Sequence, residues 1–132
     1  MHITLEADYA LRIVDTLAHS PQRMEAKAIS ERTKVTLRFS MKILRKLVAS
    51  GIVRSYRGAG GGYEIARPLS EVSVYQVLEV IDGPLTLNRC VLVDHACSRV
   101  PDKGCPYHDL FSRLTDQLKA ELSAANFDSL HK

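Results

Sequence analysis

The chain has 132 residues, of which 45% are hydrophobic and 25% charged, and its formal net charge is +3. This length predicts one domain with a short appended element, and the composition is too apolar for a disordered chain. A run of about 18 uncharged apolar residues is missing, which excludes a transmembrane helix. Glu6 and Asp8 precede any basic N-terminal region, which argues against a secretory signal. We therefore expect a cytoplasmic protein with no membrane partner.

Positive charge is concentrated in the first half of the chain. Residues 1–67 carry 12 Lys or Arg against 6 Asp or Glu, whereas residues 68–132 carry 6 against 9. From residue 34 to residue 57 there are no acidic side chains and seven basic ones: Lys34, Arg38, Lys42, Arg45, Lys46, Arg54 and Arg57. A solvated helix face usually mixes both signs, so this stretch favours a polyanionic partner such as nucleic acid.

Hydrophobic periodicity predicts three helices in this basic half, over residues 6–19, 25–33 and 37–50. Thr36 is the expected N-cap of the third helix, and Gly51 is expected to end it. On that helix three basic residues share one stripe, namely Arg38, Lys42 and Arg45. The apolar residues expected to face the core are Leu37, Met41, Leu44, Leu47 and Val48. Three helices with a basic third are typical of a helix-turn-helix.

A β-hairpin is predicted after the third helix. Residues 52–57 and 63–67 are β-prone and flank a glycine-rich tip, Gly58-Ala59-Gly60-Gly61-Gly62. A helix-turn-helix followed by such a hairpin is a winged helix. Arg57 stands where the wing would enter the minor groove of DNA, and the glycines allow a close approach of backbone to phosphate.

The second half of the chain predicts a helix over 73–82, a loop over 83–106 and an amphipathic helix over about 107–126. The last helix has an apolar stripe at Leu110, Phe111, Leu114, Leu118, Leu122 and Ala125, which favours self-association. The expected fold is mainly α with a small β-hairpin. Its expected parts are a winged helix-turn-helix (1–82), a cysteine-bearing sensor loop (83–106), and a dimerisation helix with its following segment (107–132).

Three cysteines lie in the predicted loop, at Cys90, Cys97 and Cys105, and His108 follows them closely. Thiolate and imidazole are ligands for zinc and for iron–sulfur clusters. Structural zinc sites favour shorter Cys-x2–4-Cys gaps, so the wider gaps here fit a cluster better. From the residues alone, a cluster, a zinc ion and three ordinary thiols all remain open.

Several motifs together resemble the winged-helix iron–sulfur and stress regulators of the IscR, NsrR, RirA and CymR types. They are "ADYALR", "ISERTKV", the wing "RGAGGGYEI" and the three-cysteine loop, and the match runs from about Ile3 to Leu122. The resemblance implies a homodimeric transcription factor that binds a palindromic operator. It also implies that Cys90, Cys97 and Cys105 hold the cluster.

Two residues compete for the fourth ligand position that the resemblance implies. His108, three residues after the last cysteine, matches members that hold a 2Fe–2S cluster. Asp8, contributed by the partner subunit, matches members that hold a 4Fe–4S cluster. Cluster-free members of the group sense thiols or small molecules, and that alternative, with no cofactor, stays open.

The expected DNA contacts come from the third helix and the wing: Arg38, Lys42, Arg45, Arg57, Gly58, Gly60, Gly61 and Tyr63. Members that discriminate two promoter classes carry an acidic residue where this chain has Met41, so the operator sequence does not transfer. An enzyme built on a reactive cysteine is disfavoured, because no second domain or substrate cleft is evident.

Overall fold

The computed structural model describes residues 2–92, 97–98 and 104–131. The chain opens with three helices, α1 (Leu5–Ala18), α2 (Ala26–Thr33) and α3 (Leu37–Ala49). An antiparallel hairpin follows, formed by β1 (Val53–Tyr56) and β2 (Gly62–Ile65). After the short turn η1 (Leu69–Glu71) come α4 (Val74–Asp82), a second short turn η2 (Arg89–Val91) and the long α5 (Pro106–Ala124). The predicted fold class, a winged helix-turn-helix with a long last helix, is confirmed.

The core lies between α1, α3, α4 and the start of β1. Helix α1 begins at the N-cap Thr4, whose hydroxyl accepts a hydrogen bond from the Ala7 amide, and it buries one face along its whole length. Apolar side chains from the other elements and from the segments between them close this core, among them Ile43, Leu44, Leu47, Ile52, Val53 and Val77. Burial of these side chains is the main stabilising contribution to the domain.

Helix α3 begins and ends as predicted, and its buried face matches the prediction at Leu44, Leu47 and Val48 but not at its N-terminal end. Thr36 caps it by accepting a hydrogen bond from the Phe39 amide, and Gly51 ends it with a φ of 82°. The buried positions are Ser40, Ile43, Leu44 and Leu47. The prediction that Leu37 and Met41 face inward was wrong, since Leu37 is 47% exposed and Met41 is only half-buried. Both side chains lie on the same surface as the basic stripe of this helix (Arg38, Lys42 and Arg45).

The hairpin is held against the helices by its second strand. Val53 pairs with Ile65 and Tyr56 with Gly62, and Tyr63 also forms a bridge with Met24, in the segment before α2. Gly62 has a φ of 138°, and a Cβ there would lie 2.7 Å from the Met24 carbonyl oxygen. This position therefore requires glycine for close approach of two backbones.

The segment after α5 (residues 125–131, called the C-terminal segment below) returns to the winged helix. The Phe127 side chain is 2% exposed and belongs to the core, and its amide donates to the Val72 carbonyl. The Val74 amide in turn donates to the Ala125 carbonyl at 2.8 Å. Sequence analysis did not anticipate this return, because a lone Phe in a short polar stretch has no periodicity.

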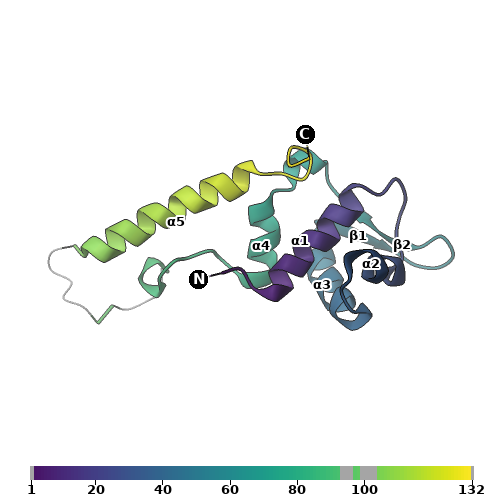
Figure 1. Cartoon of the computed structure of the whole chain (residues 1–132), viewed down its shortest axis with the longest axis horizontal. Helices are drawn as coiled ribbons and strands as arrows, with labels where there is room; N and C mark the ends of the chain where they lie inside the picture. The colour runs from purple at the N-terminus through teal and green to yellow at the C-terminus, as the bar shows by residue number, and fades with distance from the viewer. Residues whose placement is uncertain (1, 93–96, 99–103, 132) are drawn as a thin grey trace.

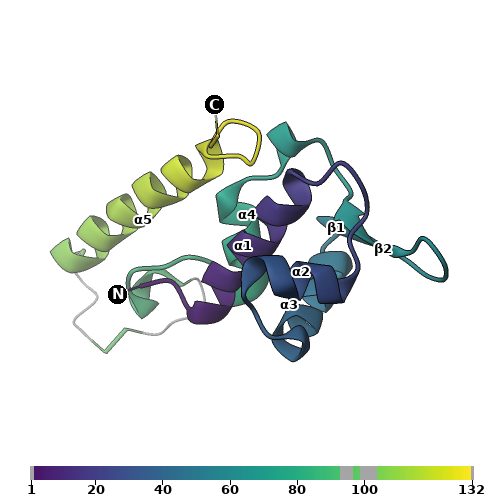
Figure 2. The same ribbon diagram turned by 45° about the vertical axis from the view of Figure 1, so that its right-hand side comes forward.

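Helix α5 projects away from the winged helix, and the hairpin tip projects from the opposite end of the molecule (Figures 1 and 2). Helix α5 packs on α4 and on η2. In this helix only Thr115 is buried, whereas Leu110, Leu114 and Leu118 remain 37–39% exposed. The apolar stripe predicted for this helix is thus largely uncovered within one chain. Among the described helices, none is long and apolar enough to cross a membrane.

Candidate DNA-binding surface and cysteine loop

The basic stripe of α3 (Arg38, Lys42 and Arg45) lies on the solvent side of the helix. All three residues are exposed, because the opposite face of the helix fills the core. They border a surface groove that is also lined by Leu37, Met41, Thr36 and Phe39. Cations and methyl-bearing side chains therefore share this surface, and both types of group contact base edges and phosphates in DNA.

One carboxylate enters this basic region. The Lys46 ammonium donates to Glu6 Oε1 at 2.8 Å, and Lys42 Nζ lies 3.8 Å from Glu6 Oε2. The Lys42 side chain is 59% exposed, so this longer contact leaves its charge accessible. Arg38, Arg45 and Arg57 form no ion pair with any residue in the described ranges. Within the described ranges, Glu6 therefore offsets only part of the positive charge of α3, and both arginines of the helix remain unpaired.

The tip of the wing presents Arg57 and backbone. Gly58 and Gly60 adopt φ values of 81° and 74°, and a Cβ at either would meet nothing within 4 Å. At Gly61, by contrast, a Cβ would lie 2.5 Å from the Tyr56 carbonyl oxygen and 2.8 Å from that of Gly58. Gly58 and Gly60 thus leave the tip open to a ligand, whereas Gly61 is needed for the tightness of the turn.

A polar network at the base of the wing was missed by sequence analysis. The Tyr56 hydroxyl donates to Glu64 Oε1 at 2.6 Å, and the Arg23 guanidinium carbon lies 3.2 Å from the centre of the Tyr56 ring. Arg54 donates to the same hydroxyl, and this hydrogen bond raises the pKa of Arg54, which stays charged. Arg23 Nε also lies 3.7 Å from Glu64 Oε2. Only the cross-strand pairing of Arg54 with Glu64 could have indicated this cluster from the sequence.

Tyr63 lies in β2, one residue after the glycine tip of the wing, and is paired with Ser55. Its ring is half-buried against the core, and its amide and carbonyl both pair with Met24. These contacts hold the hairpin against the core and against the segment before α2.

All three cysteines lie between α4 and α5, in the predicted sensor loop (83–106), of which residues 93–96 and 99–103 are outside the described residues. Cys90 lies in η2 and Cys105 is the N-cap residue of α5; both are half-buried, whereas Cys97 is exposed. Although all three lie in the described ranges, none of them forms a disulfide. No three of the expected ligands lie close enough to share a single metal ion in the described part of the chain.

The arm of the loop that carries Cys90 is fastened to α5. The Leu87 amide donates to Thr115 Oγ1 at 3.3 Å, and the Thr115 hydroxyl donates to the Phe111 carbonyl. The turn η2, which contains Cys90, also packs on α5, and Cys105 is the N-cap residue of the same helix. Cysteine thiolates are the donors that hold iron–sulfur clusters, so the type of donor present is compatible with such a group.

The two candidates for the fourth ligand lie in different environments. His108 is exposed in the first turn of α5, one helical turn from Cys105. Asp8 is half-buried on α1 and forms an ion pair with Arg12 at 2.8 Å.

Solved structures share this architecture over nearly the whole chain. CymR, the global cysteine regulator of B. subtilis, superposes with a TM-score of 0.79 and 22% identity, covering 98% of this chain and 95% of its own. IscR of T. potens gives a TM-score of 0.78 at 18% identity, covering 99% of this chain and 86% of its own. At these identities the likeness defines the class of fold, a winged helix with an added long helix.

Sequence relatives give the family. Residues 3–132 match the Rrf2 family, described as iron-dependent transcriptional regulators, and this chain belongs to that family. IscR of Photorhabdus laumondii is 30% identical over 135 residues, which cover 98% of this chain and 79% of that protein. The protein is accordingly a transcriptional regulator and not an enzyme, and DNA binding follows from its family.

Proposed function

We propose that this protein is a homodimeric regulator that binds double-stranded DNA through α3 and the wing. Arg38, Lys42 and Arg45 would lie in the major groove, and Arg57 with the open glycine tip would reach the flanking minor groove. The observation that carries this proposal is the exposed basic stripe of α3, whose two arginines have no ion-pair partner in the described ranges. Chromosomal DNA as the partner also implies a cytoplasmic protein.

Salt dependence of DNA binding tests these assignments residue by residue. Arg57→Ala and Arg38→Ala should each weaken binding and reduce the slope of log affinity against log salt concentration by about one unit, because each cation releases about one counterion. Arg113→Ala is the matched control, since Arg113 is an exposed arginine on α5. An unchanged slope for Arg57→Ala would remove the wing from the interface.

The dimer would form through α5. Its apolar stripe is more than a third exposed at Leu110, Leu114 and Leu118, and a second copy of the same helix supplies a complementary surface. A two-fold dimer of this kind presents two α3 helices. They would meet half-sites of a palindromic operator about 34 Å apart, which is one turn of DNA.

The cysteine loop would hold an iron–sulfur cluster through Cys90, Cys97 and Cys105. The thiol-rich donor set and the fastening of the Cys90 arm to α5 support this assignment. His108 would complete the ligand set, with Asp8 of the partner subunit as the alternative. When bound, such a cluster supplies iron–thiolate bonds that respond to redox state and to iron supply.

The chain itself connects this loop to the DNA-binding surface. Thr115 ties the loop to α5, α5 packs on α4, and α4 packs directly on α3. A change in how the loop lies on α5 would therefore alter how α4 supports α3, and with it the separation of the two α3 helices in a dimer. We propose that operator binding is switched along this route.

Anaerobic purification with iron and acid-labile sulfide analysis tests the cluster. The full chain should be coloured and contain both elements, and Cys105→Ser should lose them. His108→Ala and Asp8→Ala separate the two candidates for the fourth ligand, with His2→Ala as the control. A colourless protein with stoichiometric zinc would contradict the cluster assignment and leave the DNA-binding proposal intact.

A cluster-free sensor of thiols or small molecules is the second candidate. The structural likeness to CymR supports it, and the three cysteines do not form a compact group of metal ligands in the described part of the chain. It predicts a colourless, metal-free protein whose DNA affinity changes on oxidation of Cys97, the exposed thiol.

A further inference from the structure

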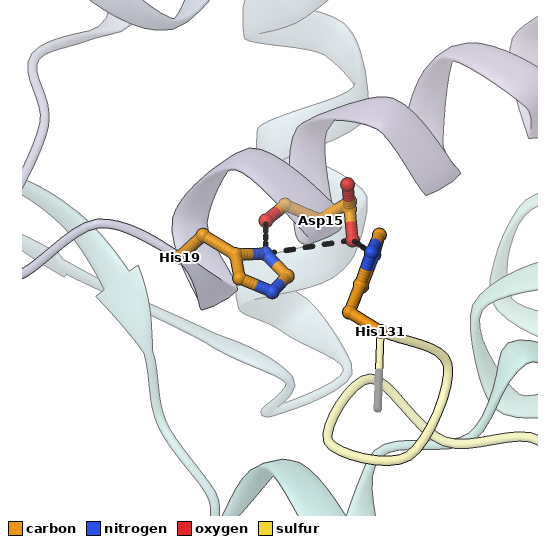
Figure 3. A group of neighbouring side chains, drawn as sticks. All are labelled: Asp15, His19 and His131. Atoms are coloured by element: carbon orange, nitrogen blue, oxygen red, sulfur yellow. Dashed lines mark hydrogen bonds and ion pairs between the residues drawn. The ribbon is translucent and has the colours of Figure 1, made fainter.

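Asp15, His19 and His131 form a cluster of side chains that the proposed function does not use (Figure 3). The Asp15 carboxylate lies between the two imidazole rings, with Oδ1 2.7 Å from His131 Nε2 and 3.6 Å from His19 Nδ1. The centres of the two rings are 4.6 Å apart. One ligand atom from each of the three residues lies within 4.8 Å of those from the other two.

The first two members are brought together by helix geometry. Asp15 and His19 are separated by four residues at the end of α1, so their side chains lie on one face of the helix. His19 is the C-cap residue, and its Nδ1 also contacts the Asp15 carbonyl oxygen at 2.8 Å.

The third member comes from more than a hundred residues further along the chain. The C-terminal segment that carries His131 is anchored by the buried Phe127 and by the Asn126 side chain, which accepts from the Asp128 and Ser129 amides. These contacts place His131 beside α1 independently of any ligand. The cluster is therefore a consequence of the tertiary fold and not of local charge alone.

We propose that these three residues bind a divalent transition-metal ion of the zinc type, outside the cysteine loop. Two imidazoles and one carboxylate are donors that such ions prefer, and a water molecule would complete the coordination. Tetrahedral zinc with bonds of about 2.0–2.1 Å requires donor atoms about 3.4 Å apart. The separations of 2.7 and 3.6 Å from Asp15 Oδ1 bracket this value, and the half-exposed side chains are free to adjust by rotation.

Binding would replace existing contacts without changing the backbone. The proton that His131 Nε2 shares with Asp15 would leave to solvent, because only a neutral imidazole nitrogen with a free lone pair binds a metal. His19 would give up its contact with the Asp15 carbonyl or present its other ring nitrogen. The ion would then join α1 to the C-terminal segment and so hold the end of α5 against the winged helix.

Calorimetric titration of the full chain with zinc chloride tests this site. The loop thiols also bind zinc, so the measured quantity is the difference in stoichiometry between variants. Wild-type protein should bind one zinc ion more than His131→Gln and one more than His19→Gln. His2→Gln, which changes an exposed histidine outside the cluster, should match the wild type.

Two further measurements separate this site from the loop. The ring resonances of His19 and His131 should shift when zinc is added to a variant with all three loop cysteines changed to serine. At a zinc concentration 100 times the dissociation constant, the folded-to-unfolded ratio of that variant should rise about 100-fold. Equal stoichiometry and affinity in the wild type, His19→Gln and His131→Gln would overturn the proposal, whatever the fate of the cluster assignment.

Discussion

At the scale of single residues, Glu6 lowers the positive charge of the surface proposed to bind DNA. It is an acidic residue of the first turn of α1, where a carboxylate also interacts favourably with the helix dipole. Its side chain is only 20% exposed, and its two oxygens face Lys42 and Lys46. Glu6 thus both holds α1 against α3 and reduces the positive charge that DNA would meet.

Replacing this carboxylate should separate the two effects. In Glu6→Gln the free energy of unfolding should fall by about 0.5 kcal/mol, because a partly exposed ion pair contributes little. DNA affinity at low salt should rise about two- to five-fold, since the basic surface loses a negative charge. Urea unfolding and DNA titration measure the two quantities, with Glu121→Gln on α5 as the control. A fall in affinity would mean that Glu6 positions the lysines for DNA rather than attenuating them.

Residue-scale prediction succeeded where a side chain follows a local rule. Thr36 and Gly51 delimit α3 as expected because capping depends on neighbouring backbone. The prediction that Leu37 is buried failed. An apolar residue at the start of a helix fits the periodic pattern whether it faces the core or solvent, and only the packing of the neighbouring helices decides between the two.

At the scale of one element, two glycines at the tip of the wing, Gly58 and Gly61, have different roles. Gly58 needs only a left-handed φ, in open space, whereas Gly61 has two carbonyl oxygens where a Cβ would stand. The sequence alone presents them as equivalent members of one glycine run. Only the folded turn distinguishes a glycine that leaves room for a ligand from one that leaves room for the chain.

Alanine substitutions should reveal this difference. Gly61→Ala should lower the free energy of unfolding by roughly 1–3 kcal/mol, because the backbone must shift to relieve the clash. Gly58→Ala should cost about 1 kcal/mol from backbone strain alone, while still reducing DNA affinity if the tip approaches phosphate. Thermal unfolding and DNA titration of both variants provide the comparison. A Gly61→Ala protein as stable as Gly58→Ala would contradict the described turn.

At the scale of the whole molecule, the C-terminal segment connects the end of α5 to the core of the winged helix. Phe127 enters the core of the winged helix, so α5 is connected to that domain through its packing on α4 and through Phe127, which follows its C-terminal end. The orientation of α5 is thereby linked to the stability of the DNA-binding part.

Removal of this anchor should be costly. Phe127→Ala should lower the free energy of unfolding by roughly 3–5 kcal/mol, because a fully buried aromatic side chain leaves a cavity. Leu130→Ala is the matched control in the same segment, since Leu130 is 50% exposed and should change stability by less than about 1 kcal/mol. Denaturant unfolding measures both. Similar losses for the two variants would show that the segment is not docked through Phe127.

The proposed dimer depends on the exposed apolar stripe of α5. Leu114→Lys should yield a monomer with unchanged helix content, because this side chain is exposed in one chain and is proposed to be buried between two. Operator affinity should fall at least about ten-fold, since one half-site is no longer held by a linked partner. Gln117→Lys, on the polar face of α5, is the control. Sedimentation and DNA titration are the measurements, and a dimeric Leu114→Lys protein would exclude this stripe as the interface.

Local patterns in the sequence were enough to predict the helices, the hairpin, the basic stripe and the loop with its three thiols. Each of these depends on residues within a turn or two of one another, through periodicity, capping and glycine conformation. Tertiary structure alone decided which face of α3 is buried, where Arg23 lies, how Phe127 completes the core and that His131 meets Asp15. Each of these features joins segments that are far apart in the chain. Their geometry depends on how apolar surfaces pack against one another, and a short-range sequence pattern carries no information about that packing.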